Sequence, residues 1–112
     1  MAQTKKLEQE QWSEFLSVFS NGNRGRLIRI EVEDTAAGER PIVDAAPLFA
    51  IDYDPVHKGN DLVISTGRDA VDYSHTVIAP TEIWQAQDDS GEVTALEIIN
   101  QNDSRTIIVL KP

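Results

Sequence analysis

Residues 12–33, WSEFLSVFSNGNRGRLIRIEVE, change their hydrophobic period from helical to extended within one short stretch. In the first part, apolar residues recur at the three- and four-residue spacing that gathers side chains on one face of a helix: Trp12, Phe15, Leu16 and Phe19. From Leu27 to Glu33, apolar and charged residues alternate, which is typical of a strand buried on one face. Residues 20–25 between them are rich in Asn and Gly, which tolerate the conformations that end helices. We therefore expect a helix over residues 7–20 that leads directly into a sheet.

The rest of the chain repeats short extended segments between turns. Strand patterns occur at residues 27–33, 42–53, 62–66, 73–79, 82–87, 93–100 and 105–110. Pro47 interrupts the second of them, and because proline cannot donate to a ladder it predicts an edge, a bulge or a break there. The last segment contains four consecutive apolar residues, 107–110, a pattern typical of a central strand covered on both faces.

These patterns predict an α+β fold with mostly β content. One N-terminal amphipathic helix packs on a bent antiparallel sheet, or a partly closed barrel, of six or seven strands. The sheet is expected to bend because a flat open sheet would leave its edges exposed. We expect a single domain over residues 1–112, with a flexible N-terminus at 1–6, the helix at 7–20 and the antiparallel β region at 26–111.

Composition narrows the class of protein. A chain of 112 residues with 40% hydrophobic and 26% charged residues has the size and balance of one globular domain. It contains no cysteine, which excludes disulfides, thiolate metal sites and a cysteine nucleophile. Neither a secretion signal nor a long apolar run is visible, so we expect a cytoplasmic protein with no membrane association.

The net charge of −9 argues against binding to nucleic acid, which requires clustered Lys and Arg. One local exception is the basic group Arg24, Arg26 and Arg29, near the end of the predicted helix. These residues are either solvated charges at the rim or contacts for an anionic or acidic partner.

Known cofactor and metal motifs are absent. The sequence contains no nucleophile elbow, Walker loop or dinucleotide fingerprint, and we expect no cofactor. Residues 52–61 form an acidic turn, but the EF-hand pattern counted from Asp52 fails at its fifth, sixth and twelfth positions, which hold Val56, His57 and Val63. The two histidines, His57 and His75, do not have the spacing of a zinc pair, so we expect no metal site.

Two residues carry the functional hypotheses that remain. His75 either has a structural role or serves as a base beside a carboxylate such as Asp72 or Asp54, if folding brings them together. Trp84 and its neighbour Ile83 should point to opposite faces of a strand, so that one of them is available as a contact surface unless both are covered.

Several segments together resemble a known family. They are Trp12-x-x-Phe15-x-x-x-Phe19-Ser20, the strand led by Gly25, Ala46-Pro47-Leu48 with Ile51-x-Tyr53-Asp54, His75-Thr76-Val77-Ile78-Ala79-Pro80-Thr81-Glu82-Ile83, and Ala95-Leu96-Glu97-Ile98. Across nearly the whole chain they are similar to a family of small bacterial proteins known only as a domain of unknown function. The resemblance implies a stand-alone bacterial protein with no assigned activity, cofactor or site residue. The chain differs by having Asn23-Arg24 before Gly25, where the family usually has His-Arg.

The sequence therefore favours a non-enzymatic interaction or accessory module with a protein partner. Self-association as a homodimer, through an edge strand or the Trp84 face, fits the same interpretation. The alternative is a small-ligand-binding or hydrolytic barrel that uses His75 with a nearby carboxylate.

Overall fold

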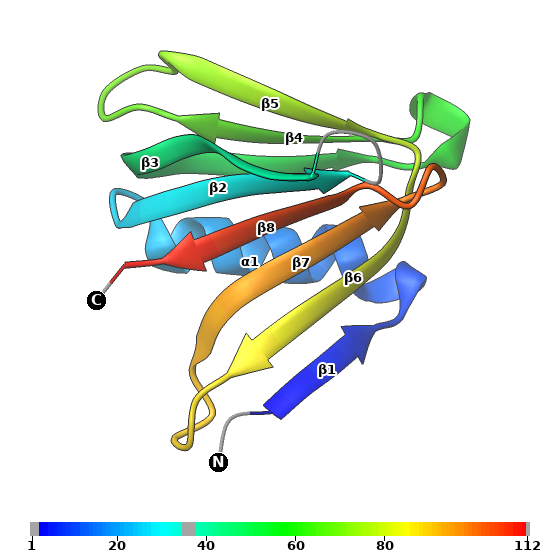
Figure 1. Cartoon of the computed structure of the whole chain (residues 1–112), viewed down its shortest axis with the longest axis horizontal. Coiled ribbons are helices and arrows are strands. Elements are labelled where there is room, and N and C mark those ends of the chain that lie inside the picture. The colour runs from blue at the N-terminus through cyan, green and yellow to red at the C-terminus, as the bar shows by residue number, and fades with distance from the viewer. Residues whose placement is uncertain (1–2, 35–37, 112) are drawn as a thin grey trace.

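The computed structural model describes residues 3–34 and 38–111 and contains one α-helix lying across one face of an antiparallel sheet (Figure 1). Within these residues the sheet has eight strands in the order β1-β6-β7-β8-β2-β3-β4-β5. The strands are β1 (Gln3–Leu7), β2 (Leu27–Asp34), β3 (Gly38–Asp54), β4 (Asp61–Thr66), β5 (Tyr73–Ile78), β6 (Pro80–Gln87), β7 (Val93–Asn100) and β8 (Arg105–Leu110). The helical elements are α1 (Trp12–Asn23) and two 3-10 turns, η1 (Gln9–Gln11) and η2 (Val56–Lys58). The predicted α+β, mostly β class with a bent antiparallel sheet is confirmed, and the sheet does not close into a barrel.

The helix begins and ends later than expected. It runs from Trp12 to Asn23 rather than over residues 7–20, because Leu7 belongs to the sheet and η1 separates the two elements. The indole Nε1 of Trp12 donates a hydrogen bond to the Leu7 carbonyl at 3.3 Å, which holds the start of the helix against the end of β1. At the other end, the Asn23 side chain donates to the Phe19 carbonyl, and Gly25 turns the chain with a φ of +87°.

The N-terminal segment is also structured differently from the expectation. The sequence predicts a flexible stretch at residues 1–6, whereas residues 3–7 form β1, paired antiparallel with β6 from Gln3 opposite Gln87 to Leu7 opposite Ile83. This strand is the eighth, beyond the six or seven that we expect from the sequence. β1 lies at one end of the sheet order, and so its second edge pairs with no strand of the described residues.

The core lies between α1 and the face of the sheet that α1 covers, which we call the inner face. Alternate residues of neighbouring strands fill it and are almost fully buried: Ile28, Ile30, Leu62, Ile64, Ile83, Leu96, Ile98 and Ile108. The helix contributes Trp12, Leu16 and Phe19, and the Trp12 ring meets Tyr53 edge-on with centroids 5.3 Å apart. Apolar burial by both layers is the main stabilising contribution to this fold.

The long strand β3 joins the two halves of the sheet. Its first part pairs with β2 as far as Leu27 opposite Pro47, and its last part pairs with β4. The β3–β4 register shifts between Leu48 and Ala50, just beyond Pro47, where the sequence predicts an edge, a bulge or a break, while β3 itself continues through Pro47. Past Pro47, β3 no longer pairs with β2, and α1 packs closely on it instead.

The connection between β5 and β6 explains why the sheet is bent. Only Ala79 separates Ile78 from Pro80, yet β5 lies at one end of the strand order and β6 is next to the other end. Ala79 turns with a φ of +54°, and its backbone is bonded to Asn60 and Gln101. The sheet must therefore curl until these two ends meet, and Figure 1 shows the chain crossing over from β5 to β6. This curl encloses the inner face and leaves the opposite face, the outer face, on the outside.

Candidate functional site

The outer face of β1, β6, β7, β8 and β2 carries the residues that alternate with the core. The pairing places side chains in rows across the strands, and the central row holds Lys6, Trp84, Glu97, Ile107 and Glu31. A neighbouring row holds Thr4, Ala86, Ala95, Val109 and Arg29. None of the helices in the described part of the chain packs on this face, which is turned away from α1 (Figure 1). The rows thus mix apolar and charged side chains, and Glu97 on β7 lies between Trp84 on β6 and Ile107 on β8.

Trp84 lies on this face, and its neighbour Ile83 is fully buried on the inner face. The alternation predicted for the pair is therefore present. The Trp84 ring is half-buried, and its indole Nε1 donates to Glu82 Oε1 at 3.0 Å. Next to it, Thr4, Glu82, Glu97, Ile99 and Arg105 line a hollow of about 360 Å³ together with Trp84. One side of the ring thus borders an open hollow, while its polar atom is already satisfied by its own strand.

Charges on the outer face are neutralised in pairs. Within the described residues, three of the four ion pairs lie here: Lys6–Glu82 at 3.8 Å, Arg29–Glu31 at 2.7 Å and Arg105–Glu97 at 3.3 Å. The Glu31 carboxylate is 15% exposed, so its neighbouring cation compensates a largely desolvated charge. The Arg29 Nε is buried and its N–H does not point at the Glu31 oxygen, so this contact is ionic without a hydrogen bond. The face is close to neutral on a chain whose net charge is −9.

Strand β8 departs from the prediction in one respect. It is central as expected, lying between β7 and β2. Ile108 and Leu110 are buried in the core, but Ile107 and Val109 are only half-buried on the outer face. The expectation of cover on both faces is therefore wrong for the described chain, because its only α-helix lies on the inner side.

The three arginines do not form one basic patch. Arg24 stacks over the Phe49 ring, with its guanidinium carbon 4.3 Å from the ring centroid. Arg26 donates from Nε to the Lys111 carbonyl at 3.1 Å and from Nη1 to Asn23 at 3.3 Å. Arg29 belongs to the outer face. Arg24 and Arg26 thus hold the loop between α1 and β2 in place.

The acidic segment at residues 52–61 spans the end of β3, the connection that contains η2, and the start of β4. Asp54 and Asp61 are opposite each other where β3 and β4 meet, and Asp52 and His57 are exposed. In the part of the chain that the structure describes, no three His, Asp or Glu side chains cluster in a way that could hold a metal ion. Asn60 accepts a hydrogen bond from the Tyr53 hydroxyl at 3.2 Å, which ties the turn to the core.

His75 lies on edge strand β5, opposite Ile64. It is half-buried, and burial lowers the pKa of its imidazole below the ordinary value. No ion pair or hydrogen bond connects it to a carboxylate among the described residues. Asp72 accepts a hydrogen bond from Thr66 at 3.3 Å, and Asp54 pairs with Asp61 at the far end of β4. The structure thus does not join His75 to either candidate acid by a direct contact.

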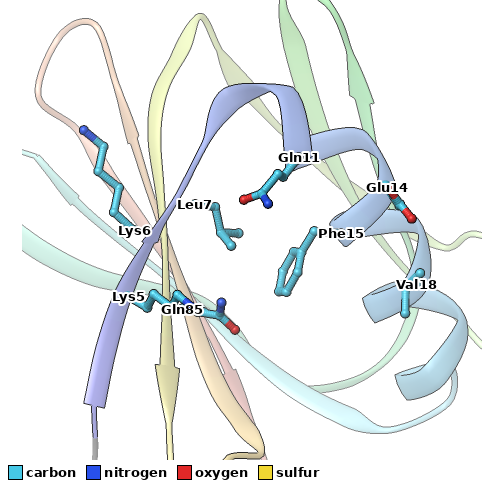
Figure 2. A pocket seen from close by; sticks show the side chains of 8 residues that line it. All are labelled: Lys5, Lys6, Leu7, Gln11, Glu14, Phe15, Val18 and Gln85. Atoms are coloured by element: carbon cyan, nitrogen blue, oxygen red, sulfur yellow. The ribbon is translucent and has the colours of Figure 1, made fainter.

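A second hollow, a groove between α1 and the end of the sheet at β1, lies on the inner side. It has a volume of about 380 Å³ and is bordered by Lys5, Lys6, Leu7, Gln11, Glu14, Phe15, Val18 and Gln85, but the side chain of Lys6 points away from it (Figure 2). Figure 2 shows Leu7 and Phe15 facing each other from β1 and α1, with Gln85 of β6 below them and next to Lys5. Sequence analysis missed this groove, because its two sides meet only through the pairing of β1 with β6. The one local signal is Gln85, a polar residue at an inner-face position of β6.

Together, the described residues define a small α+β protein with one α-helix on an open antiparallel sheet. In the described residues, no hydrogen bond or ion pair joins His75 to Asp72 or Asp54. The chain belongs to DUF5335, a family of unknown function, whose match covers residues 3–112. The resemblance found in the sequence is therefore confirmed. No curated protein and no solved structure matches the chain. In the described residues, no helix is long and apolar enough to cross a membrane.

Proposed function

We propose that the protein is a non-enzymatic interaction module, and that its outer face docks on the same face of a second copy. The observation that carries this proposal is the half-buried apolar pair Ile107 and Val109 on central strand β8, in the same face as Trp84 two strands away on β6. Apolar residues on both sides of a central strand are typical of a strand covered on both faces. In the described residues, α1 covers the inner face of the sheet, and no helix covers the outer face.

Charge supports a second copy as the partner. A chain with a net charge of −9 repels itself over most of its surface. The outer face is the exception, since its three ion pairs offset most of its carboxylates. Two copies can therefore approach each other there with little electrostatic cost, and the charged rim fixes their relative orientation.

The size of the face is sufficient for a specific contact. Five strands about 4.8 Å apart, of five to eight residues at about 3.3 Å each, cover about 24 Å by 22 Å, or roughly 500 Å² of projected area per copy. Two such faces give about 1,000 Å² in total, the lower bound for a biological interface. Two sheets packed in this way lie about 10 Å apart. Such an interface fits a reversible dimer.

Sedimentation velocity tests the proposal. Between about 1 μM and about 200 μM, where weak self-association becomes visible, the chain should shift from monomer to dimer. Trp84→Ala and Ile107→Lys should each leave it monomeric over that range, because both remove apolar contacts at the centre of the face. Ile78→Lys is the matched control: it places the same charge at a residue that is 65% exposed on edge strand β5, and it should dimerise normally.

Circular dichroism establishes that each variant is folded before it is compared. A chain that stays monomeric at the highest concentration would overturn the proposal. Equal dissociation by Ile78→Lys and by the outer-face variants would overturn it as well.

The alternative function, a ligand-binding or hydrolytic site built on His75, remains a prediction. No described carboxylate contacts His75, and the residue lines neither the groove nor the hollow beside Trp84. A cytoplasmic location also remains a prediction.

A further inference from the structure

We infer that the groove between β1 and α1 binds an extended acidic peptide, which adds to the free edge of β1 as a ninth strand. This inference does not depend on self-association through the outer face, because the groove lies on the opposite side of the sheet. Figure 2 shows its two walls, the edge strand on one side and the helix on the other. An edge strand beside a hydrophobic groove provides the main-chain and side-chain contacts by which extended peptides are recognised.

The backbone of β1 provides the first set of contacts. β1 pairs with β6 along its whole length and with no other strand of the described residues. Its outward-pointing N–H and C=O groups therefore have no ladder partner there. An extended peptide satisfies such groups by ordinary antiparallel or parallel pairing, whatever its side chains. Edge strands of natural proteins are normally shortened, charged or covered against this kind of pairing.

The walls of the groove provide an apolar pocket for one side chain. Leu7 is buried at its base, and Phe15 is half-buried on the helical wall. Val18, one turn further along α1, is 67% exposed and extends this apolar surface outward. The core does not require an apolar residue at Val18, because Leu16 and Phe19 already face the sheet. An apolar peptide side chain opposite Leu7 would enter between these residues.

Gln85 provides a polar contact on the floor of the groove. Its side chain is only 7% exposed, and its Oε1 accepts a hydrogen bond from Gln87 at 3.3 Å. Among the described residues, nothing accepts a hydrogen bond from its Nε2. The Nε2 atom itself is not buried, and a free donor on the floor of the groove fits the carbonyl or carboxylate oxygen of a bound peptide.

Charge determines which peptide fits. β1 carries Lys5 and Lys6 and no acidic residue, on a chain whose net charge is −9. Lys5 lies opposite Gln85 on the inner side and makes no ion pair with the described acids, whereas Lys6 points away from the groove and pairs with Glu82 (Figure 2). An acidic peptide residue opposite Lys5 would complete the pairing. Glu14 on the helical wall disfavours a second acid there.

The strand period links these two preferences. Lys5 and Leu7 are two residues apart and therefore point to the same side of β1. A peptide paired with β1 must present an acidic and an apolar residue at alternate positions. A peptide with apolar residues at both positions would leave Lys5 without an ion-pair partner. A peptide with acidic residues at both positions would leave the apolar pocket at Phe15 unfilled.

Peptide display provides the test. A phage library of random nine-residue peptides is selected on the folded chain, and the enriched peptide is synthesised with a fluorescent label for polarisation titrations. We expect enrichment of alternating acidic and apolar residues. Lys5→Glu should weaken binding about tenfold or more, because repulsion replaces attraction. The matched control Lys6→Glu makes the same change one residue along the strand, on the other face, and should stay within about twofold of the parent.

A second pair of variants tests the helical wall. Val18→Asp should abolish enrichment of these peptides, whereas Ser17→Asp places the same charge on a neighbouring exposed residue that borders a different hollow and should have little effect. Hydrogen exchange of the complex should slow the amides of β1. Failure to enrich any peptide, equal losses in Lys5→Glu and Lys6→Glu, or protection confined to β5 would each overturn the inference. Trp84→Ala should bind the peptide normally, which separates this result from the test of self-association.

Discussion

Ser20 should be worth far more to stability than a serine on a short helix normally is. Its Oγ accepts a hydrogen bond from the Ile51 N–H at 2.9 Å and donates to the Ile51 carbonyl at 3.4 Å. Ile51 lies in the part of β3 beyond Pro47, where β2 no longer pairs with it. The Ser20 hydroxyl thus makes hydrogen bonds to the Ile51 backbone that a neighbouring strand would otherwise make.

The size of the effect follows from what Ser20→Ala leaves behind. Ser20 is buried, so the variant leaves the Ile51 N–H without a hydrogen-bond acceptor and removes one donor from the Ile51 carbonyl. Water has little access to either group. Each buried group left without a partner costs about 1–3 kcal/mol, and we expect a total of about 2 kcal/mol because the carbonyl contact is long. With an m-value of about 1.3 kcal/mol/M, the urea midpoint should fall by about 1.5 M.

Urea titration followed by tryptophan fluorescence measures this difference, since Trp12 is buried in the same core. Ser17→Ala is the matched control, because Ser17 is an exposed serine on the same helix, and its midpoint should change little. A loss below about 0.5 kcal/mol for Ser20→Ala, or an equal loss in both variants, would refute the reasoning. A changed m-value would show instead that the variant alters how much surface unfolding exposes.

Two further predictions concern the backbone and pH. Gly67→Ala should destabilise the fold by about 3 kcal/mol or more, because Gly67 has a φ of +144° and an added Cβ would lie 2.0 Å from the Ala70 carbonyl oxygen. Gly22→Ala, in α1 with no atom near the added Cβ, should instead stabilise it by about 0.5–1 kcal/mol, and thermal unfolding distinguishes the two. Burial lowers the pKa of His75 in the folded state, so the unfolded state binds its proton first as the pH falls. The stability contributed by neutral His75 should therefore be present above the ordinary histidine pKa and be lost progressively below it. Urea midpoints between about pH 7.5 and about pH 5 should show a shallower decline in His75→Gln than in the parent, and an unchanged decline would contradict the assignment.

Strand β1 shows where periodicity fails as a guide to structure. Its sequence, Gln3 to Leu7, is polar except at the last residue, so it carries no alternation that indicates a strand. β1 is part of the sheet only through its antiparallel pairing with β6 along one edge. Because four of its five residues are exposed, β1 leaves no hydrophobic signature, and the sequence predicts six or seven strands where the fold contains eight.

Strands with one buried face can be predicted from the sequence, because the alternation of apolar and polar residues is visible without knowing which strand pairs with which. Leu27 to Glu33 alternates in the sequence and does so in the structure, and Ile83 and Trp84 separate to opposite faces as predicted. Which of the two faces receives a covering layer is not a local property. The run at Ile107–Leu110 indicates that both faces are apolar, but the single helix can cover only one of them. Sequence patterns therefore identified the apolar outer face without revealing that it is open.

The candidate sites depend even more on tertiary pairing. Lys5 and Gln85 are 80 positions apart in the sequence, and only the register of β1 on β6 brings them side by side. Asp72 and Asp54 can serve His75 only if folding brings them to it, and among the described residues no hydrogen bond or ion pair does so. Residue types indicate the available chemistry, whereas strand order determines which groups meet.

Strand β1 belongs to both proposed surfaces, and its alternation makes them separable. Lys6 sits on the outer face beside Glu82 and Trp84, and Lys5 sits in the groove opposite Gln85. Reversing the charge at Lys6 places two acids side by side on the outer face and should weaken self-association while sparing the peptide. Reversing it at Lys5 should do the opposite. Adjacent lysines with opposite defects are difficult to explain by a general change in charge or folding, because both variants carry the same net charge. They follow directly from a two-residue strand period that directs one side chain to each face. A face-to-face dimer built in this way leaves both grooves open on its outer sides, so that one dimer can hold two peptide segments of the same partner at a high effective concentration.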